Sequence, residues 1–499
     1  MLQPARVLLF NQRGPARKFR EKLFGTFGVE EVVNFSALRF TLFEHADDPV
    51  CAVTLSPGIS ADVRISYICP KPTHTSDDDY QFTIESPDVH HIHQQDAASD
   101  PYVWSAFVWG GQRDLIFVRW LRHLMSLESL KRSGVAKIRR GISRGDRRKQ
   151  QSQIGGKRIL EADEFPSDTF LTVKAKEFPI NADLRTHSKD STDFSAFALP
   201  QLILKQSWQK GHFRFQAALV ESDAKTGPLL CSRSYAGVHV PEEKHSLLEA
   251  ACAVLNSKLA VYCLLLTSGR FASYREEPNL EDLLRVPIPD AQPGLLQGIT
   301  DVDDLDTLVR DTFGFKDAEW VLVEDLFTTT LADFKGAVNS PGRQATQRTD
   351  GSNEEPQLRQ YCEYFIRVLR ASFGQDKNVS ATVFQEKTSP WLPFRFVAFH
   401  LNCDASPPIR FEALESGALL EELEQLNQKW LQTRAVKTGT IYHQRVARIY
   451  EYQDSSPTIY IIKPDACRYW TRSMGLHDAD EVAADFMRWQ MASVETMRR

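Results

Sequence analysis

The sequence lacks the features that mark membrane-spanning and disulfide-stabilised proteins. No apolar segment follows Met1, and the longest apolar stretch, around Leu259 to Leu266, is far shorter than the roughly 20 residues that a membrane-spanning helix needs. The eight cysteines contain no CxxC pair, and several, such as Cys51, Cys252 and Cys263, have apolar neighbours. Isolated cysteines in apolar contexts are typical of reduced, buried thiols. We therefore expect a cytoplasmic protein that has no membrane partner.

Groups of metal ligands and nuclease motifs are also scarce. His90, His91 and His93 form the one local cluster of metal-ligand side chains in the sequence, and no nearby cysteine or further histidine completes a site. We expect a solvated loop there and no bound metal. For a nuclease of the Asp…(Asp/Glu/Gln)-x-Lys type, the chain offers Gln385-Glu386-Lys387 after an expected strand, but no paired acidic residue precedes it.

Charge is distributed unevenly along the chain. The 499 residues include 60 lysines and arginines and 65 acidic residues, which gives a formal net charge of -5. A negative protein is a poor indiscriminate binder of nucleic acids, because phosphates are contacted by cations that displace their counterions. One stretch, residues 131–158, nevertheless contains a single acidic residue, Asp146. We call this stretch the basic island; its cations are Lys131, Arg132, Lys137, Arg139, Arg140, Arg144, Arg147, Arg148, Lys149, Lys157 and Arg158.

The first 55 residues predict an incomplete α/β sheet. Phe19, Leu23 and Phe24 recur at helical spacing on an otherwise charged segment, so we expect an amphipathic helix there. It is followed by an expected strand, a turn of helix and a buried strand: Val29 to Phe35, Leu38 to Phe43 and Val50 to Leu55. Two strands cannot close the core of an open sheet, and we expect the rest of that sheet to lie upstream.

Residues 30–55, EEVVNFSALRFTLFEHADDPVCAVTL, resemble the segment after the catalytic motif in N6-adenine DNA methyltransferases of the type I, type IIG and phage-exclusion kind. In that family a glycine-bearing S-adenosylmethionine loop and an (Asn/Asp/Ser)-Pro-Pro-(Tyr/Phe/Trp) tetrapeptide come first. Neither motif is present in this sequence. The nearest tetrapeptide, Ser406-Pro407-Pro408-Ile409, lies far downstream and lacks the aromatic residue that would stack on a flipped adenine. The FGTFG run, residues 24–28, follows a helix rather than a strand, so it is not a nucleotide loop.

The resemblance continues through the middle of the chain. Trp104 to Trp109, followed by GGQRDL, looks like the connector between the methylase and target-recognition domains of these enzymes. From Phe194 onward the sequence resembles the target-recognition domains of type I specificity subunits and type IIG enzymes. We predict one helix from Leu247 to Gly269. The most recognisable pieces are the second part of that segment, Leu255 to Gly269, and Leu280 to Asp290, LEDLLRVPIPD. The resemblance implies that this part binds DNA and reads its sequence.

The C-terminal part resembles no family that we can name. Two helices are expected between Asp301 and Gly336, and the polar segment Asn339 to Pro356 is the best domain boundary. After it we expect a helix, two strands, an acidic helix and a last strand: Leu358 to Phe373, Val379 to Phe384, Phe394 to Leu401, Leu419 to Leu431 and Ile459 to Pro464. Asp478 and Glu481 have the spacing of a capping box that would begin a final helix. The expected domains are 1–130, 131–338 and 357–499.

Three groups of residues are candidates for contact with nucleic acid. The basic island could be a DNA-backbone surface, a flexible tether or a solvated loop, and its glycines favour a loop; because guanidinium groups bind phosphate bidentately, we favour phosphate contact. The candidates there are Arg139, Arg140, Arg144, Arg147, Arg148 and Lys149. Candidates for base edges, each of which could also be an ordinary surface residue, are Lys205, Gln206, Arg214, Gln216 and Arg233. Arg468, Trp470 and Arg472 suit stacked bases or a protein partner, unless Trp470 closes the last core.

Residues and resemblance together predict an α/β and α+β multidomain protein. It would have a partial Rossmann-like methylase sheet, a target-recognition-like α+β domain and a separate α+β C-terminal domain. The expected function is the DNA-recognition half of an adenine-N6 DNA methyltransferase from a restriction-modification or phage-defence system. The chain would bind double-stranded DNA, while a catalytic methylase polypeptide, for which the upstream reading frame is a candidate, would supply S-adenosylmethionine binding and catalysis. The alternative is a non-enzymatic DNA-targeting or scaffold subunit of a defence complex, and a C-terminal nuclease is the weaker one.

Overall fold

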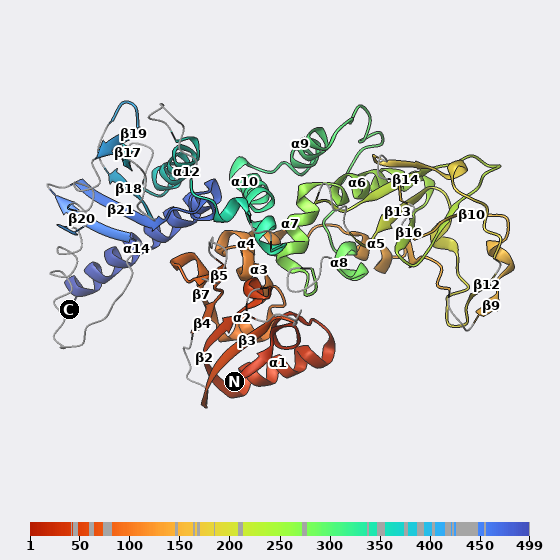
Figure 1. Cartoon of the computed structure of the whole chain (residues 1–499), viewed down its shortest axis with the longest axis horizontal. Helices are drawn as coiled ribbons and strands as arrows, with labels where there is room; N and C mark the ends of the chain where they lie inside the picture. Colours follow the sequence, from red (N-terminus) through yellow and green to blue (C-terminus); the bar gives the residue numbers. More distant parts are fainter. Residues whose placement is uncertain are drawn as a thin grey trace. The chain divides into compact units, whose positions relative to one another are not determined.

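The computed structural model divides into two compact units (Figure 1), each described by itself. Unit 1 comprises Met1–Lys71 and Phe82–Phe327, and unit 2 comprises Pro72–Gln81 and Thr328–Arg499. The structure describes residues 1–40, 42, 48–58, 64–72, 82–144, 148–162, 165–166, 170–183, 185–207, 213–271, 277–336, 339–346, 355–373, 378–386, 394–401, 405–414, 421, 424–425, 448–453 and 456–498. The α/β and α+β multidomain class is confirmed.

The first part of unit 1 is a mixed sheet with helices packed on it. Its strand order is β1-β3-β2-β4-β7; β2 and β4 are parallel, and the other three pairs are antiparallel. The bounds are β1 (Leu2–Pro4), β2 (Phe27–Asn34), β3 (Val50–Pro57), β4 (Arg64–Ile68) and β7 (Val89–His93), with β5 (Lys71–Pro72) and β6 (Phe82–Thr83) outside this sheet. Strands β2 and β3 pair directly because no long crossover helix lies among the described residues between them. The predicted α/β character is therefore present, with mostly antiparallel pairing.

Helix α1 (Gly14–Thr26) packs on β2 and on α2 (Gln94–Ser99). Leu23 and Phe24 are buried as the helical spacing predicts, while Phe19 is exposed. The ring of Phe24 stacks on Trp104 at 5.2 Å. Trp104 also meets Tyr67 edge-on at 5.0 Å. These rings form the core between the sheet and the helices.

The second part of unit 1 contains a five-stranded sheet of order β11-β14-β13-β16-β8. Strands β11 and β14 are parallel, and the remaining pairs are antiparallel. The bounds are β8 (Lys137–Arg140), β11 (Thr172–Lys174), β13 (Gln201–Lys205), β14 (Ala217–Glu221) and β16 (Tyr235–His239). Two smaller pairs flank it: β10 (Arg158–Leu160) with β15 (Leu229–Cys231), and β9 (Arg148–Gln150) with β12 (Arg185–His187).

The basic island is therefore not one loop. It supplies β8, β9 and β10, and the expectation of a loop is wrong for those segments. Ile138 and Ile159 explain the outcome, because both are buried in the core and anchor their strands. Gly141 adds to this: a Cβ on it would lie 2.0 Å from the carbonyl oxygen of Ser232, so the close approach of the two backbones requires glycine.

The apolar segment Leu247 to Gly269 forms two helices rather than the one predicted. Helix α6 (His245–Leu255) and helix α7 (Lys258–Thr267) are separated at Asn256 and Ser257, and the axes bend by 73°. The Asn256 amide donates to the carbonyls of Cys252 and Ala217, both at 2.8 Å, and this competes with a continuous helix. In the described part of the chain no single helix has the length and apolarity to cross a membrane; this bent pair meets both criteria only when its two halves are taken together.

Helix α7 is buried along its length and connects the two parts of unit 1. It contacts α3, α4, α6, α8, α9 and α10. The remaining helices of unit 1 are α3 (Val103–Trp109), α4 (Gln112–Leu121), α5 (Leu127–Arg132), α8 (Leu280–Leu284), α9 (Val302–Phe313) and α10 (Asp317–Asp325). Two helices in the range 301–336 were predicted, and α9 and α10 confirm them.

Unit 2 is a five-stranded sheet with two long helices on one face. The strand order is β19-β17-β18-β21-β20, in which only β17 and β19 are parallel. The bounds are β17 (Val379–Glu386), β18 (Phe394–Leu401), β19 (Ile409–Leu414), β20 (Arg448–Gln453), β21 (Ser456–Pro464), α11 (Leu331–Phe334), α12 (Pro356–Phe373) and α14 (Arg472–Arg498). Helices α12 and α14 pack on each other, and their apolar faces share a core with the sheet. The predicted helix and three predicted strands of this part are confirmed.

Two expectations about this part turn out differently. The capping box is wrong, because α14 already begins at Arg472 and Asp478 points into the core, where it pairs with Lys463. The acidic helix at 419–431 lies almost wholly outside the described residues. The division between the units falls between Phe327 and Thr328, so the expected linker 339–356 lies within unit 2.

Candidate nucleic-acid interface

The antiparallel ribbon of β9 and β12 presents one polar face. Arg148 is directly opposite His187, and Gln150 is directly opposite Arg185. Directly opposed and alternate residues of a ribbon share a face, so these four side chains point the same way. Arg148, Gln150 and Arg185 are exposed and His187 is half-buried, whereas Thr186 on the other face is fully buried. In Figure 1 the ribbon lies at the end of unit 1 farthest from α1.

Asp183 holds both arginines of this face. Its Oδ2 accepts from a terminal nitrogen of Arg148 at 2.9 Å, and its Oδ1 accepts from Nε of Arg185 at 3.1 Å and from the Arg185 backbone N–H at 3.0 Å. The hydrogen bond from Arg185 is the main reason that the pKa of Asp183 lies below its usual value. Asp183, Gln150 and Arg185 also line an open hollow of about 570 Å³. The carboxylate therefore fixes where two exposed guanidinium groups lie.

Three of the other predicted phosphate contacts of the basic island, Arg139, Arg144 and Lys149, have partners within the protein. The side chain of Arg139 is 12% exposed, pairs with Asp190 at 3.1 Å and lies over the Phe194 ring at 4.7 Å. Little of the Arg139 side chain is therefore left to contact a phosphate. Arg144 is exposed and pairs with Glu161 at 2.8 Å. The ammonium of Lys149 donates to the carbonyl of Asp190 at 2.7 Å.

Arg140 is half-buried at the end of β8. Arg147 lies outside the described residues.

The predicted base-reading residues separate into two groups. Gln206 is half-buried and donates to the carbonyl of Arg233 at 3.3 Å, and Arg233 itself is exposed, so these two lie together on the surface. Lys205 is half-buried and donates to Gln216 at 3.1 Å. Gln216 is buried, so it has no exposed edge to offer, and the prediction for it was wrong.

Arg214 was also predicted wrongly, because it is a buried structural cation. Its two terminal nitrogens donate to the two oxygens of Asp306 at 2.9 and 2.7 Å, and both side chains are 6% exposed. Lys258 pairs with the same carboxylate at 3.2 Å and donates to it from its backbone N–H at 2.9 Å. A guanidinium in this arrangement joins the second sheet of unit 1 to α7 and α9 and cannot reach a base.

In unit 2, the candidate group near the start of α14 is mostly internal. Trp470 is fully buried, meets Tyr361 edge-on at 5.0 Å and donates to the carbonyl of Pro464 at 2.9 Å. The alternative that Trp470 closes the core is therefore correct. Arg468 pairs with Asp333 at 3.2 Å and its side chain is 10% exposed, while Arg472 is half-buried. A stacking platform for bases does not form from these residues.

The histidine cluster lies in β7 rather than in the expected loop. His90 is buried and stacks on Phe107 at 4.2 Å, whereas His91 and His93 face outward. Lys387 of the possible nuclease motif lies outside the described residues. Among the residues that the structure does describe, His477, Asp478 and Glu481 have ligand atoms within 4.8 Å of one another, but Lys463 and Arg448 already pair with the two carboxylates.

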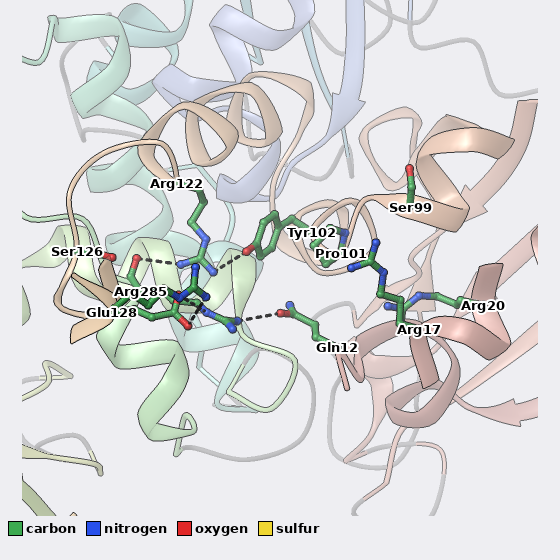
Figure 2. A pocket seen from close by; sticks show the side chains of 11 residues that line it. Gln12, Arg17, Arg20, Ser99, Pro101, Tyr102, Arg122, Ser126, Glu128 and Arg285 are labelled. Atoms are coloured by element: carbon green, nitrogen blue, oxygen red, sulfur yellow. Dashed lines mark hydrogen bonds and ion pairs between the residues drawn. The ribbon is translucent and has the colours of Figure 1, made fainter. Parts of the chain in front are cut away.

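A cluster of arginines that the sequence reading missed lines a pocket in unit 1 (Figure 2). The pocket has a volume of about 350 Å³, and Arg17, Arg20, Arg122, Arg132 and Arg285 contribute to its wall. These residues are far apart in the sequence, so no local motif signals the pocket. The basic island is the sequence feature that indicates the β9–β12 ribbon. No sequence feature marks Gln150, Arg185 or His187 as a site residue.

The comparisons with known proteins are sparse. No protein-family model and no curated protein matches the chain. Among solved structures, the type IIG restriction endonuclease BpuSI aligns with 68% of this chain and 46% of its own, with 12% sequence identity and a TM-score of 0.26. The alignment spans less than half of that enzyme, and at this level of similarity it identifies no functional residue.

Proposed function

We propose that this chain is the DNA-recognition half of an adenine-N6 DNA methyltransferase system, and that the β9–β12 ribbon reads the DNA sequence. The observation that carries the proposal is the polar face made by Arg148, Gln150, Arg185 and His187. A two-stranded ribbon fits the major groove of B-DNA, arginine pairs bidentately with guanine, and glutamine pairs with adenine. The face thus combines the right shape with the right side chains.

Beside this ribbon, the basic island offers Arg144 for contact with the DNA backbone. Arg144 is exposed where the chain leads into β9, although it pairs with Glu161, whereas Lys149 lies on the opposite face from Arg148 and donates to the carbonyl of Asp190. Cations beside a groove-reading element neutralise backbone phosphates and set the register of the protein on the duplex. Their number is small, which agrees with a protein of net negative charge that binds chosen sites rather than any DNA.

In this proposal the chemistry is carried by a separate catalytic polypeptide. That partner would bind S-adenosylmethionine and the flipped adenine, because the sequence of this chain contains neither the glycine loop nor the tetrapeptide that do so in the family it resembles. This chain would select the site and hold the duplex. A restriction-modification or phage-defence system is the setting that the resemblance implies.

Binding experiments with selected duplexes test the reading role. Full-length chain would first be used to enrich bound sequences from a random duplex pool, and the enriched site would then be measured with the variants Arg185→Ala and Gln150→Ala. Each should lose about 1–3 kcal/mol of discrimination at one base pair, or roughly 5- to 150-fold. Lys189→Ala, an exposed cation just after β12 and outside the polar face, is the control and should leave the sequence preference unchanged.

Methyl transfer tests the other half of the proposal. Activity from S-adenosylmethionine to DNA would be measured with this chain alone, with the catalytic polypeptide alone and with both together. Activity that needs the mixture and loses site selectivity with Arg185→Ala supports the split enzyme. Sequence-selective DNA binding without methyl transfer in the mixture would favour the non-enzymatic targeting subunit instead.

A further inference from the structure

The arginine pocket of unit 1 is built from segments that come from both of its parts. Figure 2 shows Arg17 and Arg20 from α1 on one side and Arg122, Glu128 and Arg285 on the other. Arg122 directly follows α4, and Arg285 directly follows α8. Gln12 and Tyr102 lie between the two sides. Because all of these segments belong to one compact unit, the arginines are held together by the fold.

Charge within this pocket is poorly balanced. Glu128 is the one carboxylate among the described residues that line it, beside the five arginines. Glu128 is shared between Arg132 at 3.1 Å and Arg285 at 3.2 Å. Arg17, which also lines the pocket, pairs with Glu21 at 2.8 Å, and Glu21 itself is not part of the pocket wall. Several guanidinium groups thus face one volume with a single negative group to offset them, which favours an anionic ligand.

Apart from the pairing of Arg285 with Glu128, the hydrogen-bond partners of the two central arginines, Arg122 and Arg285, are neutral groups. Arg122 donates to the carbonyl of Arg285 at 2.9 Å and to the Tyr102 hydroxyl at 2.7 Å, and its guanidinium lies 4.7 Å from the centre of the Tyr102 ring. Arg285 donates to Gln12 at 3.3 Å, and Gln12 is itself anchored on the carbonyl of Thr267 at 3.1 Å. Neutral oxygens orient a guanidinium group without neutralising its positive charge. These contacts therefore fix the direction of the N–H donors and leave their charge available to an anion.

Arg20 contributes a buried positive charge at the back of the wall. It is 2% exposed, and one terminal nitrogen donates to the carbonyls of Leu8, Leu9 and Asn11 at 3.2, 3.0 and 2.9 Å. Burial is the main cause that lowers its pKa, yet an arginine stays protonated in proteins. The Nε of Arg20 has no hydrogen-bond partner among the described residues. Glu21 acts on this charge, but the hydrogen bonds of the Arg20 side chain to described residues go to carbonyl oxygens rather than to a carboxylate. Burial of such a cation is costly, and an anion in the pocket would offset that cost.

We propose that this pocket binds a phosphate group, with Arg122 and Arg285 as the central donors and Arg17 and Arg132 at the rim. Phosphate fits better than a carboxylate because guanidinium groups can approach its oxygens from several directions. The arginines here come from four places in the fold: α1, the end of α4, α5 and the end of α8. The phosphate belongs either to the DNA backbone, in which case the inference deepens the proposed function and rests on it, or to a free phosphate or nucleotide.

A neighbouring hollow of mixed charge adjoins the pocket. It has a volume of about 560 Å³, shares Gln12 and Arg285 with the pocket, and adds Arg6, Arg13 and Arg270 together with the carboxylates of Glu281 and Asp282. A duplex whose phosphate enters the pocket would extend beyond it, over surfaces such as this hollow. A small free anion would need the pocket alone, and this difference guides the experiment.

The test uses the full chain and two matched double variants. Arg17→Gln with Arg132→Gln removes two rim charges whose side chains are 60% and 73% exposed, so the fold should tolerate the change. Lys18→Gln with Lys131→Gln removes two charges from exposed positions of the same helices, outside the pocket wall, and is the control. Affinity for the enriched duplex would be measured across salt concentrations, and again with a neutral methylphosphonate at each backbone position in turn. Calorimetry with inorganic phosphate gives the second readout.

If the bound phosphate belongs to DNA, the rim variant should have a shallower dependence of log affinity on log salt concentration than the control. The slope should fall by about one for each lost contact. A DNA phosphate also predicts that the methylphosphonate which weakens the wild type most has a smaller effect on the rim variant, since both remove the same contact. A free phosphate predicts binding of inorganic phosphate that the rim variant weakens, with DNA affinity equal to the control. If both readouts match the control, the proposal is overturned. A failure of the ribbon proposal would appear separately, as Arg185→Ala behaving like Lys189→Ala.

Discussion

The ion pair between Arg214 and Asp306 gives a direct test of whether Arg214 is structural or reads DNA. The perturbation is Asp306→Asn, which keeps the shape of the side chain but removes its charge. In the unsubstituted protein, the terminal nitrogens of Arg214 lie 2.9 and 2.7 Å from the oxygens of Asp306, and the ammonium of Lys258 lies 3.2 Å away. The neutral amide of the variant no longer balances these two positive charges. Both members of the main pair are 6% exposed, so water replaces little of what is lost.

The expected cost follows from this burial. Breaking a buried pair by removing one partner costs about 3–5 kcal/mol, because the other charge is left uncompensated. Unit 1 has roughly 320 residues and an unfolding entropy of about 2.1 cal/mol/K per residue, so this cost corresponds to a fall of roughly 4.5–7.5 °C in its melting temperature. Replacing both partners by apolar residues, as Arg214→Met with Asp306→Leu, should recover most of the loss.

The assay is thermal unfolding of the full chain followed by calorimetry, together with binding of the enriched duplex. Asp311→Asn is the matched control, because Asp311 lies on the same helix with 60% of its side chain exposed. The reasoning would be refuted if Asp306→Asn melted like the control. It would also be refuted if Arg214→Met with Asp306→Leu folded stably but lost discrimination at a base pair, since Arg214 would then take part in reading DNA.

Three further outcomes are expected. Trp470→Ala should destabilise unit 2 by about 3–5 kcal/mol, measured by calorimetry, and leave DNA affinity unchanged, because the ring is fully buried. Asp478 is buried, which by itself raises its pKa, but the Lys463 ammonium and His477 outweigh burial and hold the pKa below the usual value. Its stabilising contribution is thus present above a pH of about 3.9 and lost below it, and Asp478→Asn should flatten this acid limb in pH-dependent unfolding. Gly141→Ala should cost about 1–3 kcal/mol or more, since the new Cβ meets backbone oxygens of Ser232 and Cys231 at 2.0 and 2.4 Å, whereas Gly25→Ala in α1 meets nothing within 4 Å and should stabilise by about 0.5–1 kcal/mol in the same denaturation assay.

Elements with apolar periodicity could be predicted from the sequence. Helix α1 has its predicted position because Leu23 and Phe24 lie on its buried side, and β18 has its predicted position because it is a short apolar run that is buried on both faces. The break between α6 and α7 was missed, since both halves are apolar on every side and only the Asn256 side chain, bonded to Ala217 in a distant strand, marks the bend. Strand β9 was missed because RKQ has no apolar alternation and its partner β12 lies 35 residues later.

The candidate sites show the same limit. Arg148 and Lys149 could be nominated because they lie in a run of cations, but their outcome depended on Asp183 and Asp190, which the sequence places more than 30 residues away. Arg214 and Gln216 have the composition of surface residues and are buried by contacts with α9 and β13. The arginine pocket combines residues 12 to 285, and only the packed structure brings them together.

Asp183 also makes Arg148 and Arg185 interdependent. Because one carboxylate positions both guanidinium groups, removing either arginine frees the carboxylate to move toward the other, so the two substitutions should not have additive effects. If the ribbon reads DNA as we propose, a change of recognised sequence during evolution would require paired replacements on β9 and β12. Single-site libraries of this ribbon would mostly return weakened binders, whereas libraries that vary positions 148, 183 and 185 together could return binders with a new preference.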